Sequence, residues 1–138
     1  KDVFSENLSF CNIAPSSALL HKSIFKSVDL FDESLEVCED YDLWLRIMIE
    51  NKIALVDKKL IRKYAGHEDQ LSFKYWGMDR FRVFTLEKLL KNENKINEEK
   101  VQMIKEELLK KYTLLLKGAI KHDREEDIKI YEGKIAQF

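Results

Sequence analysis

From Val37 to Ile47 the sequence reads Val-Cys-Glu-Asp-Tyr-Asp-Leu-Trp-Leu-Arg-Ile, and this stretch decides how the chain is interpreted. At about 100° per residue its apolar side chains cover one broad face, which predicts a helix over residues 39–50. The acidic residues at its start are typical of a helix N-terminus. Asp42 and Arg46 fall on the narrow strip that remains, at the i, i+4 spacing of an exposed ion-pair row.

Asp40 departs from this pattern, because it projects into the middle of the apolar arc whereas Glu39 falls near the polar strip. A carboxylate in this place has two interpretations. It can cap free backbone N–H groups and complement the helix dipole. Alternatively, it can act as a general base at the floor of a cleft. Spacing alone favours the capping role, because helix starts commonly carry Asp.

The composition is that of one ordinary folded domain, or of one domain with an appendage. The chain has 138 residues, of which 45% are hydrophobic and 36% are charged. Its net charge of -1 excludes a strong general attraction to nucleic acid, so we expect no nucleic-acid partner. Two cysteines are too few for a disulfide framework and indicate a reducing compartment. Because the first residue is Lys1, we expect the chain to be a piece of a longer protein.

Residues 1–72 predict an α+β arrangement, a small sheet with helices. Short apolar runs at residues 16–21, 53–56 and 60–65 are typical of strands. Residues 22–28 carry apolar side chains at the spacing of one or two helical turns. The first region is therefore expected to be a small sheet flanked by helices.

Residues 73–138 predict a bundle of helices. Aromatic residues recur at helical spacing from residue 73, and Asn97 is a good N-cap for a long amphipathic helix. Asp123 and Glu126 have capping-box spacing at the start of a last helix. The side chains expected in the core are Phe73, Trp76, Phe81, Phe84, Val101, Ile104, Leu108, Tyr112, Leu115, Ala119, Ile128, Tyr131 and Ile135.

Lysines on the long helix, Lys105 and Lys110 to Lys121, alternate with glutamates, which predicts a solvated face. An association of this face with a membrane surface is the alternative.

Three motifs together resemble those of one enzyme family. The segment Glu39–Arg46, read after Phe31–Leu35, is similar to the acidic motif of family-two glycosyltransferases of the GT-A fold. The segment Pro15–Lys22 resembles the strand that precedes this motif in the family. Downstream, Gly66–Ser72 is similar to a Gly-Gly-His-x-Asp-Gln-Leu-Ser loop of one branch, with Ala65 where that branch usually has glycine. The order and the spacing of the three motifs make the resemblance specific.

The resemblance implies an inverting transfer of a sugar from a nucleotide-sugar donor to a glycan or lipid-linked acceptor. In the family, the Asp of the Glu-Asp motif deprotonates the acceptor hydroxyl, so Asp40 is the expected catalytic base, with Glu39 beside it. A divalent metal, Mg²⁺ or Mn²⁺, is expected in the intact enzyme.

The resemblance also implies substrate-binding residues on two other segments. His67 and Gln70 are expected in a loop over the donor, although a surface-loop histidine is the simpler interpretation of His67. Ser16 and Ser17 are expected to line the acceptor pocket, or else to satisfy the backbone beside Pro15.

Asp40 and Asp42 also match the Asp-x-Asp pattern of a metal site. Helical spacing separates the two carboxylates by about 200°, so they cannot share one ion. The family's metal motif and nucleotide-binding half are expected before Lys1, so we expect this chain alone to bind no metal and to be inactive. We expect the reaction in the cytoplasm, or at the inner face of the membrane. A non-catalytic helical module, which docks a partner or forms a homodimer, is the alternative.

Overall fold

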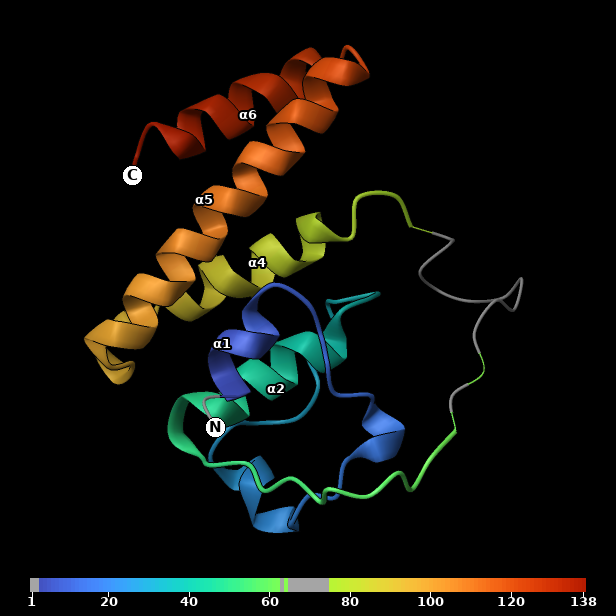
Figure 1. Ribbon diagram of the computed structural model, residues 1–138. Coiled ribbons are helices and arrows are strands. Elements are labelled where there is room, and N and C mark those ends of the chain that lie inside the picture. Colours follow the sequence, from blue (N-terminus) through green and yellow to red (C-terminus); the bar gives the residue numbers. More distant parts are fainter. Residues whose placement is uncertain (1–2, 63, 65–74) are drawn as a thin grey trace. The chain divides into compact units, whose positions relative to one another are not determined.

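A computed structural model describes residues 3–62, 64 and 75–138, and Figure 1 shows the course of the chain. The chain divides into two compact units, Lys1–Met78 and Asp79–Phe138. Within the described residues no helix combines the length and the apolar composition that a bilayer crossing needs. The described α-helices are α1 (Val3–Leu8), α2 (Glu39–Glu50), α4 (Asp79–Leu90), α5 (Glu98–Lys121) and α6 (Glu125–Ile135), with 3-10 helices at Pro15–Ser17, Lys22–Lys26 and Glu93–Lys95.

The prediction of an α+β fold is wrong, because the described residues contain helices and no strand. The expected strand at 16–21 begins inside the 3-10 helix Pro15–Ser17, where the proline occupies the first position. Residues 53–56 have no regular structure, and Leu55 is 86% exposed. The described part of 60–65 has no regular structure either. A strand needs a partner for its backbone groups and a cover for its apolar side chains, and the described residues supply neither here.

The first unit is built around α2, and the helix predicted over residues 39–50 is confirmed. Helix α1 packs against it. The hydroxyl of Tyr41 donates a hydrogen bond of 2.5 Å to the carbonyl of Leu8, and Nε1 of Trp44 donates one of 2.9 Å to the carbonyl of Ile13. These bonds attach the end of α1 and the segment that follows it to the first two turns of α2. The buried apolar residues of α2 are Tyr41, Leu43, Trp44, Leu45, Ile47 and Met48.

Asp42 is buried and Arg46 is half-buried on α2, so the prediction of an exposed row is wrong for this pair. Asp42 has no exposed surface, and its Oδ2 accepts a hydrogen bond of 2.8 Å from Nε of Arg46. The same guanidinium donates to the carbonyl of Val28 and, at 2.8 Å, to that of Leu30. The predicted i, i+4 pair therefore exists, but the guanidinium of this pair also holds the preceding loop by hydrogen bonds.

The second unit consists of α4, α5 and α6, with α5 packed against both of the others (Figure 1). The predicted cap of α5 is confirmed, because Oδ1 of Asn97 accepts a hydrogen bond of 2.8 Å from the N–H of Lys100. Most of the predicted apolar face of this helix is also confirmed. Its buried members are Ile104, Leu108, Tyr112, Leu115 and Ala119.

Three details predicted from the sequence are wrong. Trp76 and Phe84 are 52% and 45% exposed, so neither belongs to the core. Helix α6 begins after Arg124 without a side-chain cap, and Asp123 lies in the preceding turn with a left-handed φ of 50°. The capping box expected at Asp123 is therefore absent, because Asp123 belongs to the turn before α6 and is not the residue that caps the helix.

The lysine face of α5 is not wholly solvated, because Lys111 is only 4% exposed. Its Nζ lies 2.9 Å from Oδ1 of Asp79 on α4 and 3.2 Å from Oε1 of Glu107. Arg82 also donates to Asp79, at 2.9 Å. Burial alone would raise the pKa of Asp79, but the hydrogen bonds from Lys111 and Arg82 outweigh it and hold that pKa below the ordinary 3.8.

We expect this cluster to make the second unit sensitive to acid. Because the pKa of Asp79 is lower in the folded state, its contribution to stability is complete above the ordinary value of 3.8 and is lost as the pH falls through the lower folded value. Lys111→Met should leave two carboxylates without their shared cation and so lower the melting temperature at neutral pH. The difference from the unchanged chain should shrink in acid.

Thermal melts followed by circular dichroism between about pH 2 and pH 7 measure this difference. Lys117→Met, at an exposed position of the same helix, is the control. Equal melting temperatures of the Lys111→Met variant and the unchanged chain at pH 7 would contradict the prediction.

The hydroxyl of Tyr41 should contribute measurably to the stability of the first unit. Tyr41→Phe leaves the buried carbonyl of Leu8 without this donor, so the free energy of unfolding should fall by about 1–2 kcal/mol. Urea unfolding followed by circular dichroism measures it, and Tyr64→Phe, at an exposed position, is the control. The same urea midpoint in both variants would show that the bond is not needed.

Candidate functional site

Asp40 lies half-buried in the first turn of α2. Cys38, immediately before the helix, has a left-handed φ of 64°, and its side chain makes no capping hydrogen bond. Oδ1 of Asp40 instead accepts a hydrogen bond of 2.7 Å from the N–H of Tyr41. One carboxylate oxygen therefore satisfies a backbone group that the helix start leaves free.

Burial, followed by the negative charge of the Asp40 carboxylate, raises the pKa of the half-buried Cys11 thiol to about 12, with a smaller contribution from Cys38. The Sγ atom also lies 3.3 Å from the carbonyl oxygen of Ile13, to which it donates. Cys11 is therefore protonated at neutral pH, and it acts as a hydrogen-bond donor and not as a nucleophile.

Further acidic residues border the start of α2. Glu39, next to Asp40, is half-buried, and Glu36 lies exposed on the preceding loop. The charge of Glu36, followed by burial and a hydrogen bond with Glu36, raises the pKa of Tyr75. Glu36 and Glu39 make the surface beside the start of α2 acidic, so it suits a neutral or cationic ligand better than an anionic one.

The other residues expected from the resemblance do not all fall within the described part of the chain. His67 and Gln70 lie outside the described residues. Ser16 and Ser17 are exposed in the 3-10 helix Pro15–Ser17. The hydroxyl of Ser17 donates a hydrogen bond of 2.7 Å to the carbonyl of Ala14, which is the local backbone role considered for it.

The described residues do not fit a divalent metal ion. No group of three or more His, Cys, Asp or Glu side chains within them is arranged to hold one. Asp40 accepts a hydrogen bond from the N–H of Tyr41, whereas Asp42 is paired with Arg46. No chemical step is therefore assigned to a metal in this part of the chain.

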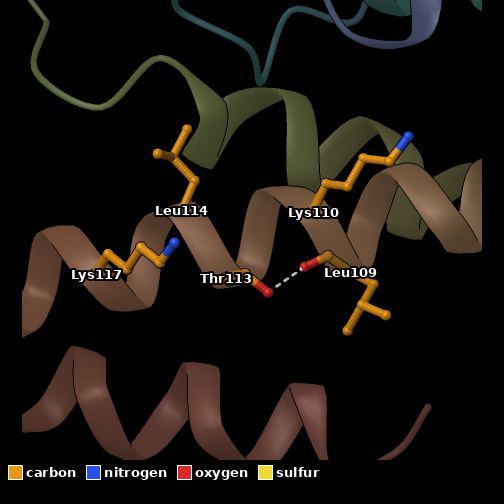
Figure 2. Close-up of a pocket in the computed structure, with 5 residues that line it drawn as sticks. All are labelled: Leu109, Lys110, Thr113, Leu114 and Lys117. Atoms are coloured by element: carbon orange, nitrogen blue, oxygen red, sulfur yellow. Dashed lines mark hydrogen bonds between the residues drawn. The ribbon is translucent and has the colours of Figure 1, made fainter.

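A second feature is a shallow groove on the outer side of α5. Figure 2 shows Leu114 and Lys110 projecting to one side of the helix and Leu109 to the other, with the hydrogen bond of 2.8 Å from the hydroxyl of Thr113 to the carbonyl of Leu109. Lys117 completes the lining. Leu114 is 57% exposed. The groove therefore combines apolar side chains with ammonium groups.

The sequence pattern did not indicate Cys11 as a site residue. The segment that carries Cys11 is held by the hydrogen bonds of Tyr41 and Trp44 to the carbonyls of Leu8 and Ile13. No local motif encodes such a pairing. The one signal available was the presence of aromatic residues with polar tips, which require partners when they are buried.

Comparisons with known protein families, with curated proteins and with solved structures found no match to this chain.

Proposed function

We propose that this chain is the acceptor-side part of an inverting family-two glycosyltransferase and that Asp40 is its general base. The observation that carries the proposal is the Glu39-Asp40 pair in the first turn of α2, within a motif that resembles that of the family. Half-burial supports the role, because the carboxylate is held by the protein and is still open to a ligand. Its Oδ1 accepts a hydrogen bond from the backbone, which holds the carboxylate at the helix start, as a positioned general base requires.

In the proposed reaction, Asp40 accepts the proton of an acceptor hydroxyl. The oxygen then attacks the anomeric carbon of the donor sugar and forms the new C–O bond. The bond between that carbon and the diphosphate breaks at the same time, and the nucleoside diphosphate leaves with the electron pair. Attack from the side opposite the leaving group inverts the configuration. Proton removal by a positioned carboxylate contributes about 100- to 10,000-fold to such a rate.

The donor would be a nucleotide sugar and the acceptor a glycan or a lipid-linked sugar. The negative charges of Glu36 and Glu39 near the helix start support an uncharged hydroxyl acceptor at this side. A cytoplasmic location, at or near the inner face of the membrane, suits the two free thiols and a nucleotide-sugar donor.

The test uses the complete protein encoded by the reading frame that contains this chain. Release of nucleoside diphosphate from a panel of nucleotide sugars, with glycan acceptors present, measures transfer. Asp40→Asn should lower the turnover by about 100-fold or more while leaving donor binding intact, because the amide keeps the shape but does not take up the proton.

Glu50→Gln is the matched control, since it neutralises an exposed carboxylate at the other end of the same helix. Its turnover should stay normal. Near-normal turnover of the Asp40→Asn variant would rule out the proposed role.

The groove on α5 favours a second candidate function, the assembly of a homodimer. Leu109 and Leu114 are exposed there beside Lys110 and Lys117. The first turn of α6 carries acidic residues, and Glu125 and Glu126 are exposed. A second copy of the chain could therefore supply both the apolar cover and the opposite charge.

Light scattering across a range of concentrations tests the homodimer. The mass of the unchanged chain should rise with concentration, and less so at high salt, whereas Leu114→Glu should remain a monomer. Leu55→Ser, which also removes an exposed leucine but lies outside the groove, should behave as the unchanged chain does. A monomer mass at every concentration would exclude the homodimer.

A further inference from the structure

We propose that residues 52–62 form a docking segment for the surface of an anionic lipid bilayer. Their sequence is Lys-Ile-Ala-Leu-Val-Asp-Lys-Lys-Leu-Ile-Arg, and they follow α2 in the first unit. The inference goes beyond the proposed sugar transfer and does not depend on it, because it rests on the exposure and the charge of this segment.

The docking segment exposes large apolar side chains that a folded chain ordinarily buries. Leu60 is 72% exposed, and Leu55, Val56 and Ile61 each expose more than half of their surface. A single exposed apolar residue is common, but here four lie within seven consecutive positions. Such a concentration is typical of a surface that another molecule or a lipid phase covers.

The backbone of the docking segment has no regular structure and turns between two apolar pairs. The N–H of Lys58 donates a hydrogen bond of 2.8 Å to the carbonyl of Val56. This tight turn separates Leu55 and Val56 from Leu60 and Ile61. The segment is therefore not a straight strand that could extend the sheet of a partner along its whole length.

The docking segment is basic, although the chain as a whole is slightly acidic. Lys52, Lys58, Lys59 and Arg62 are exposed, and Asp57 is the one acidic residue in the sequence of this segment. The local charge is therefore +3, whereas the whole chain carries -1. Each cation near an anionic bilayer adds to the attraction, and the long side chains of Lys and Arg can reach the headgroups while their stems lie on apolar groups. The charge thus selects an anionic surface.

The mixture of residues favours a lipid surface over a protein partner. The centre of a protein–protein interface is depleted of charged residues, and of lysine in particular. Lys58 and Lys59 stand between the two apolar pairs, so a protein that covered both pairs would also take ammonium groups out of water, which is costly. At a bilayer, the apolar side chains enter the boundary with the acyl chains and the ammonium groups stay among the headgroups.

The docking segment would lie on the bilayer and not cross it. Its apolar runs, residues 53–56 and 60–61, are far shorter than the about 20 residues of a crossing helix. The association should therefore be reversible, and it should weaken as salt screens the charges.

The first arm of the experiment measures the binding of this chain to lipid vesicles by flotation. Vesicles of phosphatidylcholine and phosphatidylglycerol in equal parts should bind the chain, and pure phosphatidylcholine should bind it much more weakly. Lys58→Gln together with Lys59→Gln should weaken binding to the anionic vesicles by about ten- to thirtyfold. Lys117→Gln together with Lys121→Gln, at exposed positions of α5, is the matched control and should bind as the unchanged chain does.

The apolar side chains are tested by a separate pair of variants. Leu60→Ser together with Ile61→Ser should weaken vesicle binding by about tenfold or more, because two apolar side chains are no longer buried at the lipid boundary. Leu114→Ser together with Ile120→Ser removes two exposed apolar side chains of α5 and is the control. Circular dichroism checks that each variant is folded. Equal effects of the two pairs would overturn the inference, because binding would then not depend on the docking segment.

The second arm locates the contact in the complete protein, where other parts of the chain can also bind lipid. Trypsin cleaves after Lys58 and Lys59, and peptide mass spectrometry follows the rate of each cleavage. Anionic vesicles should slow these two cleavages several-fold, whereas cleavage after the exposed Lys26 should keep its rate. Vesicles of pure phosphatidylcholine should slow neither. Unchanged cleavage after Lys58 and Lys59 in the presence of anionic vesicles would overturn the inference.

Two further outcomes would also overturn the inference. The first is equal binding to anionic and to pure phosphatidylcholine vesicles, because the charge would then select nothing. The second is that another copy of the chain covers the docking segment. Light scattering without lipid would show this as a mass that rises with concentration in the unchanged chain but not in the Leu60→Ser, Ile61→Ser variant. None of these measurements involves sugar transfer, so their failure leaves the proposed role of Asp40 untouched.

Discussion

The first unit depends on side chains of α2 that donate hydrogen bonds to carbonyl groups at a helix end and in irregular segments. Tyr41 donates to the last residue of α1, Trp44 to the segment after α1, and Arg46 to the loop that contains Leu30. Segments without regular structure leave their carbonyls without backbone partners, and a buried carbonyl without a donor is costly. Helix α2 therefore supplies an apolar core and, through the polar groups of Tyr41, Trp44 and Arg46, the donors that its neighbours need.

This need for hydrogen-bond donors explains why side chains that combine apolar surface with a polar group are concentrated in the motif of α2. A helix that only buried an apolar face would be served by leucine and isoleucine, whereas Tyr, Trp and Arg each combine apolar surface with a donor. Asp42 belongs to the same arrangement, since it holds the guanidinium of Arg46 in place from a fully buried position. The motif thus has a structural role that exists alongside any catalytic role of Asp40.

Helices could be predicted from the sequence where the signal was local. The period of apolar residues was enough for α2 and for most of the buried face of α5, and the side chain of Asn97 marked where α5 begins. Local periodicity could not establish a strand, because a strand depends on a partner distant in the sequence. The burial of Lys111 could not be predicted from the sequence either, because its partner Asp79 lies on another helix.

The candidate site likewise has features that follow from local sequence and features that depend on contacts between distant segments. Periodicity singled out Asp40 from its neighbour Glu39, because the angle of a residue on a helix follows from its position alone. The effect of Asp40 on the pKa of Cys11 could not be predicted, because the two residues belong to segments distant in the sequence. Ser17 was assigned two roles, and only the coordinates show its bond to the carbonyl of Ala14.

The buried Lys111 also affects how this protein can be handled. Reagents that acylate amines need access to the nitrogen, and along α5 they meet the exposed Lys110 and Lys117 but not Lys111, which is enclosed between two carboxylates. Dyes, biotin or a solid support can thus be attached through the outer lysines while the cation that joins α4 to α5 is left intact. Acylation of Lys111 would then report that the second unit has opened.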